Sequence, residues 1–486
     1  MTDPEAQPHD HVHQEAARRG LRKTSSKTMG WDTEHKDFPR NWPFPRKVHD
    51  ALIIFFWEYY TAVLSTTGAS ASEALMTEYG LSRVVCLTGF QFLYGIGQAI
   101  GGVVMPPFSE ALGRRLSYLI SATVYCIACL ITGLPPSPAG PFIGRFIAGF
   151  ASAVPEVILA GSIEDQYSSR PRLWFLWLWN CCTVLGLGTG PIYASYIIDA
   201  IGWRWVYHTA AIVSAVVFLL VLFLRENRPT TILSNDADVP NPDRIGNWRE
   251  LLQIIVIRPT RLGITEPIII LASVLSATAW GIVYLFTESF TVVYGGFGFS
   301  TRASSLPFIA IFPGVLASGV VRLWDYNLLI RREKAQQSTV PEDKIGGFAL
   351  AAPALAMGLW IFGWTVPPMV HVHWIASMFG ISLIGFAANE FSFTLSGYIA
   401  DAYTIYAGSA MAATAVLRGV AAGCMPLFAY PMYSGLGSNV ATSILAAVAT
   451  VYCVTPFIFL KYGRQLRERS PFARYTMEVN QQHGAD

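Results

Sequence analysis

The feature that most constrains the fold of this chain is a series of long windows without a charged residue. They cover residues 84–109, 116–144, 173–198, 206–224, 267–287, 303–321, 345–370 and 419–460. A bilayer core of about 30 Å requires roughly 20 apolar residues in a helix. A helix of a soluble protein would show a polar stripe about every 3.6 residues, and these windows do not. The windows therefore predict helices that span a membrane.

Twelve spans result when stretches that tolerate a few charges are added and the turn at 434–439 divides the longest window. We predict spans at 51–70, 84–107, 116–134, 138–161, 173–198, 206–224, 267–288, 303–323, 348–366, 372–397, 409–433 and 440–460. The charged residues that we single out inside them are Glu58, Arg145, Glu156, Glu390 and Arg418.

Composition agrees with a lipid environment. Only 14% of the 486 residues are charged, against about 25% in soluble proteins. The 34 basic and 32 acidic residues nearly balance, which leaves no basic excess for binding nucleic acid. A disordered chain is excluded because 52% of the residues are hydrophobic. The seven cysteines show no metal-ligand spacing, so we expect no metal and no cofactor.

The placement of Lys and Arg orients the spans, because cytoplasmic loops are enriched in both. With both termini inside, the basic residues that do not fall on cytoplasmic segments are Arg83, Arg145, Arg204, Arg302 and Arg418. We predict an all-α membrane protein with a cytoplasmic tail at 1–48, a six-helix half at 49–224, a cytoplasmic linker at 225–265, a second half at 266–460 and a cytoplasmic tail at 461–486. Two six-span halves around a polar linker are typical of secondary transporters.

Three motifs carry a resemblance to a known family. Residues 106–115 read Pro-Pro-Phe-Ser-Glu-Ala-Leu-Gly-Arg-Arg, residues 144–149 read Gly-Arg-Phe-Ile-Ala-Gly, and residues 186–191 read Gly-Leu-Gly-Thr-Gly-Pro. In this order they resemble the loop between spans 2 and 3, the span 4 arginine and the antiporter motif of the major facilitator superfamily, in its fungal branch of twelve-span drug:proton antiporters. The resemblance covers about residues 40–470.

The resemblance implies the major facilitator fold and roles for several residues. A cytoplasmic gate latch against the second half would be formed by Glu110, Gly113, Arg114 and Arg115. A bent antiporter helix would contain Gly186, Gly190 and Pro191. Arg145 would lie near the translocation path and tune a carboxylate, and the alternative is that it anchors neighbouring helices by hydrogen bonds.

Proton coupling requires a carboxyl group that gains and loses a proton as the cavity changes sides. Glu58 and Glu390 are the most deeply placed acids, with Arg145, Glu156 and Arg418 as further candidates. Either glutamate could instead be a structural hydrogen-bonding residue. Polar and aromatic side chains on the same spans are candidates for a substrate cavity: Trp57, Tyr60, Gln91, Gln98, Asn180, Trp280 and Phe391.

We therefore predict a secondary transporter that exports small organic compounds, such as drugs or secondary metabolites, in exchange for protons. We expect a monomer in the plasma membrane, or in the vacuolar or another internal membrane. The alternatives are an uptake symporter or facilitator for a sugar or an organic acid, a multi-pass membrane enzyme and a non-transporting sensor. The enzyme alternative lacks a His/Asp or Cys/His constellation, and the 26 residues after 460 are short for a signalling tail.

Overall fold

The structure, a computed structural model, describes residues 21–23, 29–31, 35–232, 247–337, 340–369, 372–474 and 476. Most of the predicted tail at 1–48, the middle of the predicted linker at 225–265 and the end of the predicted tail at 461–486 lie outside the described residues. A short antiparallel hairpin, β1 (Leu21–Lys23) and β2 (Met29–Trp31), precedes the helices.

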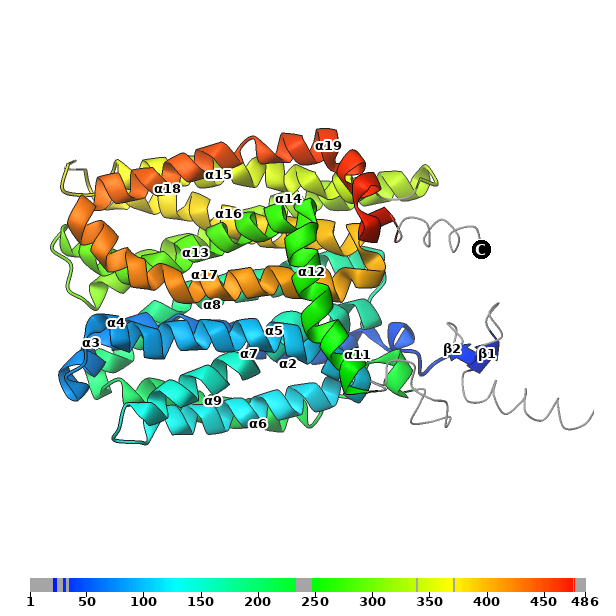
Figure 1. The fold of residues 1–486 in the computed structure, drawn as a ribbon, viewed down its shortest axis with the longest axis horizontal. Helices are drawn as coiled ribbons and strands as arrows, with labels where there is room; N and C mark the ends of the chain where they lie inside the picture. The colour runs from blue at the N-terminus through cyan, green and yellow to red at the C-terminus, as the bar shows by residue number, and fades with distance from the viewer. Residues whose placement is uncertain are drawn as a thin grey trace, which may run out of the picture.

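The remaining elements are helices, most of them running parallel to one another (Figure 1). The first group comprises α2 (Phe44–Ser65), α3 (Thr67–Tyr79), α4 (Arg83–Leu87), η2 (Thr88–Phe92), α5 (Leu93–Leu112), α6 (Arg114–Gly133), α7 (Ala139–Gln166), α8 (Ser169–Ile201) and α9 (Arg204–Val221). The second group comprises α13 (Pro267–Gly295), η4 (Ala303–Ala310), α14 (Ile311–Lys334), η5 (Pro341–Lys344), α15 (Ile345–Gly363), α16 (Ile375–Ala402), η6 (Thr404–Tyr406), α17 (Ala407–Leu436), α18 (Ser438–Tyr452) and α19 (Thr455–Arg469). We call these groups the first and the second half.

Within the described residues, eleven helical segments are long and apolar enough to cross a membrane, and each matches one of the twelve predicted spans. The predicted span at 51–70 is also helical, but it is divided between α2 and α3, which meet at Thr66. It is not among the eleven. Asp50 and Glu58 lie on α2, and their carboxyl groups make this helix less apolar.

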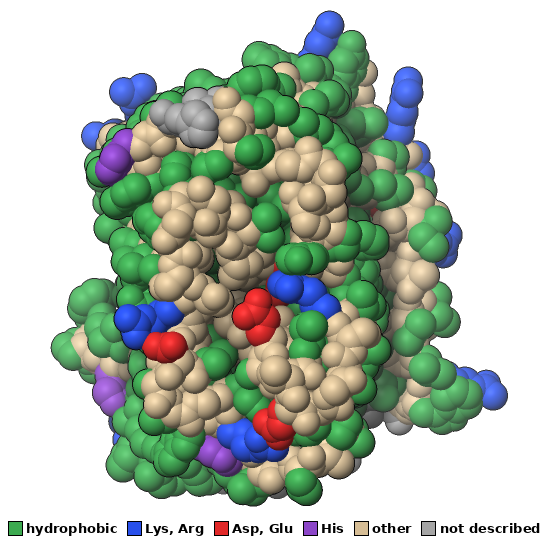
Figure 2. Space-filling model, turned by 90° about the vertical axis from the view of Figure 1, so that its left-hand side faces the viewer, with side chains coloured by type: hydrophobic (Ala, Val, Ile, Leu, Met, Phe, Trp, Pro, Cys, Tyr) green, Lys and Arg blue, Asp and Glu red, His purple; other side chains and the backbone are tan. Residues whose placement is uncertain are grey.

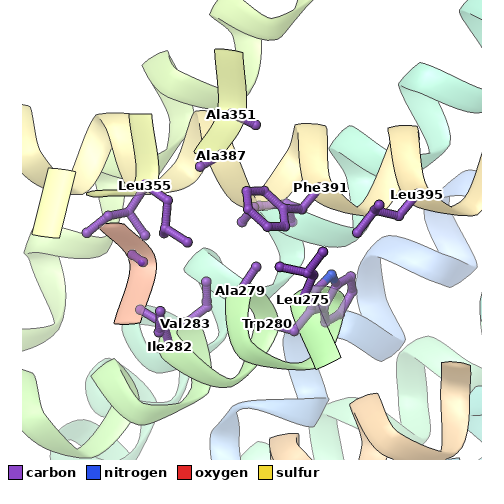
Figure 3. Close-up of a cluster of buried hydrophobic side chains, with 14 of the residues drawn as sticks. Leu275, Ala279, Trp280, Ile282, Val283, Ala351, Leu355, Ala387, Phe391 and Leu395 are labelled. Atoms are coloured by element: carbon purple, nitrogen blue, oxygen red, sulfur yellow. The ribbon is translucent and has the colours of Figure 1, made fainter. Parts of the chain in front are cut away.

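Each half packs around its own hydrophobic cluster. The cluster of the first half takes its buried side chains from between Ala51 and Leu224, whereas that of the second half also takes a few from α2 and α8. Figure 3 shows part of the second cluster, where Trp280 of α13 and Phe391 of α16 lie among aliphatic side chains. The second cluster therefore reaches the boundary between the halves, to which α2 and α8 contribute side chains.

A repeat relates α7 of the first half to α16 of the second. Both helices have 28 residues, and glycines recur at the same steps from the helix start. The matching pairs are Gly144 and Gly380, Gly149 and Gly385, Gly161 and Gly397, followed by Asp165 and Asp401. Their packing matches as well: α7 lies against α5 and α6, and α16 lies against α14 and α15. Small residues let helix backbones approach closely, so these glycines fix equivalent helix pairs in the two halves.

One helical run was not anticipated from the sequence. α11 (Trp248–Leu252), η3 (Gln253–Ile257) and α12 (Arg258–Thr265) follow one another without a break. In Figure 1 this run lies across the direction of the spans, at the end of the bundle where the described parts of the two chain ends also lie. We call this end the tail face and the opposite end the loop face.

Candidate functional site

Four helices each carry one buried glutamate within the apolar part of the bundle. They are Glu58 on α2, Glu156 on α7, Glu288 on α13 and Glu390 on α16, and none is more than 8% exposed. A charged carboxylate is costly in such surroundings unless a cation or hydrogen bonds neutralise it. The partners of each glutamate therefore indicate what it can do.

Glu390 belongs to an ion-pair cluster inside the second half. Its Oε2 accepts a hydrogen bond of 2.5 Å from Arg322 of α14, and Arg322 also pairs with Asp325 at 2.8 Å. Arg322 is 1% exposed and Glu390 is fully buried. Glu390 was predicted as a site residue from the sequence, whereas Arg322 was not, because this arginine follows directly after a charge-free window.

Glu156 joins the two halves. Arg418 of α17 in the second half forms an ion pair with it, and Gln98 of α5 donates a hydrogen bond of 2.7 Å to its Oε2. The guanidinium of Arg418 also lies over the indole ring of Trp280, 4.8 Å from its centroid. Four residues that the sequence suggested separately thus form one polar cluster at the boundary.

Glu58 has a different environment. Thr183 of α8 donates a hydrogen bond of 2.7 Å to its Oε1, while Oε2 is buried without a hydrogen-bond partner in the described part of the chain. Among the described residues, no Lys or Arg forms an ion pair with Glu58, although three such pairs hold the other three glutamates. The arrangement favours the neutral, protonated carboxyl group, because no described cation forms an ion pair with it and one of its oxygens has no described hydrogen-bond donor.

Arg145 binds backbone rather than a carboxylate. It donates to the carbonyl oxygens of Phe90 at 2.7 Å and Leu64 at 3.1 Å, and its guanidinium lies 4.2 Å from the ring centroid of Tyr94. The side chain thereby connects α7 to η2 and α2. This geometry is that of the interhelical anchor, the alternative that the sequence left open.

The residues of the Gly-Arg-Arg motif make contacts with Glu226, which follows α9, and with Asp165 of the first half. Gly113 has a φ of +98°, and the backbone N–H groups of Arg114 and Arg115 donate to the carboxylate of Glu226 at 2.8 and 3.0 Å. The carboxylate thus caps the start of α6, where free N–H groups attract an anion. The Arg114 guanidinium contacts Asp165 of α7 at 3.3 Å.

The gate latch predicted from the resemblance is therefore not formed against the second half in this structure. Arg115 donates to the carbonyl oxygen of Leu222, again within the first half. Glu110, the acidic residue of the predicted latch, makes no ion pair with any described residue. The acidic residue that binds the backbone of Arg114 and Arg115 is Glu226 and not Glu110. This contact could not be foreseen, because Glu226 is far from the motif in the sequence.

The helix with the antiporter motif packs against α2. A Cβ atom at Gly186 would lie 2.6 Å from the carbonyl oxygen of Tyr59, and one at Gly190 would overlap the carbonyl oxygen of Val63. Pro191 lies inside α8, which continues through it to Ile201. The glycines thus hold α8 in close contact with α2, beside Glu58.

The predicted cavity residues separate into two sets. Asn180 lies on the boundary, where its Nδ2 donates to Oδ1 of Asn389 in the second half at 2.9 Å, and Gln98 and Trp280 belong to the cluster around Glu156. The others face the interior of one half or bond to backbone there. Trp57 packs against Tyr125, Tyr60 binds the hydroxyl of Tyr193, Gln91 donates to the carbonyl oxygen of Ser65, and Phe391 packs against Phe348.

Ion pairs also join the halves at the loop face. Arg83 of α4 pairs with Glu288 of α13 at 2.5 Å, and Arg302 pairs with Asp199 of α8 at 2.7 Å. Acidic and basic side chains lie next to each other on this face in Figure 2. The pair of Arg204 and Glu78 lies within the first half. The three arginines that depart from the predicted charge bias therefore each have an acidic partner.

A cavity of about 40 Å³ lies beside Glu288. Side chains of both halves line it, many of them hydroxyl-bearing: Ser70, Ser72, Thr287, Thr291, Ser304 and Ser305 are examples. Sites for small organic ligands usually measure about 300–1,000 Å³, so this cavity is smaller than such a site.

Contacts also join the two halves on the tail side of the boundary. They are the ion pair of Arg170 with Glu333 and a hydrogen bond of 2.8 Å from Trp177 to Ser318. The halves thus meet toward both faces in this conformation.

Two helical halves that face each other across a boundary of buried carboxylates and arginines define a class of protein, the secondary transporters of the membrane. A family model described as "Major Facilitator Superfamily" matches residues 53–422. The chain belongs to this superfamily, as the sequence motifs predicted, and is a multi-pass membrane transporter of small substrates.

Curated relatives are fungal transporters. "Efflux pump radE" of Floropilus chiversii is 29% identical over 89% of this chain and 83% of its own length. "Multidrug transporter TPO1_2" of Candida glabrata is 27% identical over 90% and 78%. These relatives confirm the predicted resemblance to the fungal branch. Among solved structures, the human organic anion transporter MFSD10 (TETRAN) aligns with a TM-score of 0.60 at 16% identity, over 86% of this chain and all of its own.

Proposed function

We propose that this transporter exports small organic compounds, such as drugs or secondary metabolites, in exchange for protons. The direction of transport is supported by the names of the relatives, among them an efflux pump and a multidrug transporter. Proton exchange is supported by Glu58, a buried carboxyl group without a cation partner in the described part of the chain. Parting of the halves toward either face would hydrate this group and allow it to lose its proton.

The proposed mechanism is alternating access by rocking of the halves. Arg83–Glu288 and Arg302–Asp199 would part when the loop face opens, and the contacts of α8 with α14 would part when the tail face opens. The pair of Glu156 and Arg418 lies between these two sets and would change partners during the cycle. Arg145 and the antiporter helix with Gly186, Gly190 and Pro191 would keep the first half rigid.

We further propose that both tails and the linker at 225–265 are cytoplasmic, that the halves have the boundaries 49–224 and 266–460, and that a monomer works in the plasma membrane. The placement of Lys and Arg supports the orientation. Residues 106–115 would act in the gate through the turn at Gly113 and the contacts of Arg114 and Arg115 with Glu226 and Asp165.

Replacement of Glu58 tests the proton exchange. In proteoliposomes, Glu58→Gln should abolish transport driven by a pH gradient, because the amide cannot carry a proton, but should leave exchange of labelled for unlabelled compound. Glu58→Asp is the matched control and should keep part of the driven transport. Full gradient-driven transport by Glu58→Gln would remove this residue from the mechanism.

A further inference from the structure

The helical run at 248–265, which we call the linker helix, touches both halves of the transporter. Its η3 segment packs against α5, and its α12 segment packs against α17 and α13. Figure 1 shows it lying across the spans, so it runs along the plane in which a membrane surface would lie. Four of its 18 residues are charged, and it is not among the segments that could cross a membrane.

The depth of the linker helix follows from its contact with α17. A Cβ atom at Gly263 would lie 3.5 Å from that of Ala413, which comes six residues after Ala407, the first residue of α17. At 1.5 Å per residue this contact is about 9 Å along α17 from its tail-face end. The linker helix thus lies beside the first turns of a helix that is long and apolar enough to span a membrane.

Apolar side chains cover much of the surface that the linker helix leaves open. Pro259 and Leu262 are buried against the bundle. Five large apolar side chains are instead exposed: Trp248, Leu252, Val256, Ile257 and Ile264, with exposed fractions from 44% to 70%. Exposed apolar surface of this kind marks contact with a membrane or with another protein.

The charges of the linker helix distinguish between these two partners. Arg249, Arg258 and Arg261 are opposed by a single acid, Glu250. Each basic residue beside a membrane strengthens binding to anionic lipids about fivefold. A helix that lies in the membrane plane, with exposed apolar side chains and a basic excess, matches an anionic lipid surface.

We propose that the linker helix is a binding surface for anionic phospholipids of the cytoplasmic leaflet. Its exposed apolar side chains enter the boundary between headgroups and acyl chains, and its three arginines bind the lipid phosphates. The proposal uses the orientation proposed above only to name the leaflet. The experiments below place the same lipids in both leaflets, so their outcome does not depend on that orientation or on what is transported.

The position of the helix can be measured in the full chain. An environment-sensitive fluorescent amino acid replaces Val256, and the protein is reconstituted with phosphatidylcholine and phosphatidylserine. We expect quenching by lipids with a nitroxide on the upper acyl chain and little quenching by iodide in the water. The same probe at Gln337, an exposed residue after α14, is the control and should be quenched by iodide. Quenching of the Val256 probe by iodide, or protection from both quenchers as in a protein–protein contact, would overturn the proposal.

The preference for anionic lipid is tested with brominated lipids and the same probe. Brominated phosphatidylserine should quench severalfold more strongly than brominated phosphatidylcholine at equal content, and this preference should disappear in Arg249→Gln/Arg258→Gln/Arg261→Gln. The matched control, Lys461→Gln/Arg464→Gln/Arg469→Gln on α19, removes as many charges and should keep it. Equal quenching by both lipids in the unaltered protein, or an unchanged preference in the first triple variant, would contradict the proposal.

Discussion

Four glutamates are buried in this bundle, yet their partners give them different capacities. Glu156, Glu288 and Glu390 each bind an arginine from another helix, whereas Glu58 binds the hydroxyl of Thr183. A buried glutamate that pairs with a cation can remain charged, whereas one without a cation favours the protonated form. We therefore expect gating or structural roles for the paired residues and a proton-carrying role for Glu58.

Removal of Arg322 should destabilise the second half. Arg322→Met leaves Glu390 and Asp325 buried without their cation, and breaking a buried ion pair in this way costs about 3–5 kcal/mol. The unfolding midpoint in detergent should fall clearly. Arg464→Met is the control, because its pair with Glu468 is exposed and should matter little. An unchanged midpoint for Arg322→Met would show that the cluster contributes no stability.

At this scale the sequence identified the right kinds of residue but not their partners. Glu58, Glu156, Glu390 and Arg418 were found because each is a charged residue inside a predicted span. Arg322 and Glu288 were missed as site residues because each follows directly after a charge-free window. The cap of α6 by Glu226 depends on a contact across more than 100 residues, which periodicity and spacing do not contain.

At the scale of helices, the matching glycines of α7 and α16 show why the two halves have the same internal packing. In α7, Gly149 lies against the backbone of α5 and Gly144 against that of α6. In α16, Gly385 lies against the backbone of α14 and Gly380 against that of α15. Each also ends with an aspartate that pairs with a basic residue at the tail face, Asp165 with Arg114 and Asp401 with Lys344. The equivalence is hidden in the sequence because few other positions agree.

A side chain at these glycines should separate the helices. In Gly385→Ala the new Cβ would lie 2.6 Å from the carbonyl oxygen of Ile311, and overpacking of this kind costs about 1–3 kcal/mol. The unfolding midpoint should fall. Gly435→Ala, on α17 with no atom within 4 Å, is the control and should not lower it. Equal midpoints for both variants would contradict the packing role.

Charge-free windows predicted the long helices well because burial in lipid requires apolar residues all around a helix. The same reasoning missed the division of the first span at Thr66 and the whole linker helix. The linker helix mixes arginines with apolar residues, so it contains no long charge-free window and was assigned to a polar linker. It also contains the π-helical segment η3.

At the scale of the whole molecule, the account predicts a gate at the loop face. Arg83→Ala removes the ion pair with Glu288, so the halves should part more often beside the cavity. A cysteine at Ser305, which lines that cavity, should then react severalfold faster with a membrane-impermeant thiol reagent. The exchanged pair Arg83→Glu/Glu288→Arg should restore slow labelling.

Arg204→Ala is the matched control for the gate, because its partner Glu78 belongs to the same half. It should leave the labelling rate at Ser305 unchanged. If Arg83→Ala labels as slowly as the unaltered protein, or if Arg204→Ala labels as fast as Arg83→Ala, then the pair of Arg83 and Glu288 does not control opening.

The central claim is that this transporter exchanges organic compounds for protons, and transport under an imposed pH gradient tests it most directly. Purified protein is placed in liposomes with an acidic lumen, and uptake is measured for a panel of fluorescent organic compounds. The account predicts that at least one compound accumulates in the acidic lumen, only when the protein is present, and is released when a protonophore collapses the gradient. Protein-dependent uptake that is indifferent to the gradient, or that accumulates compounds on the alkaline side, would contradict it.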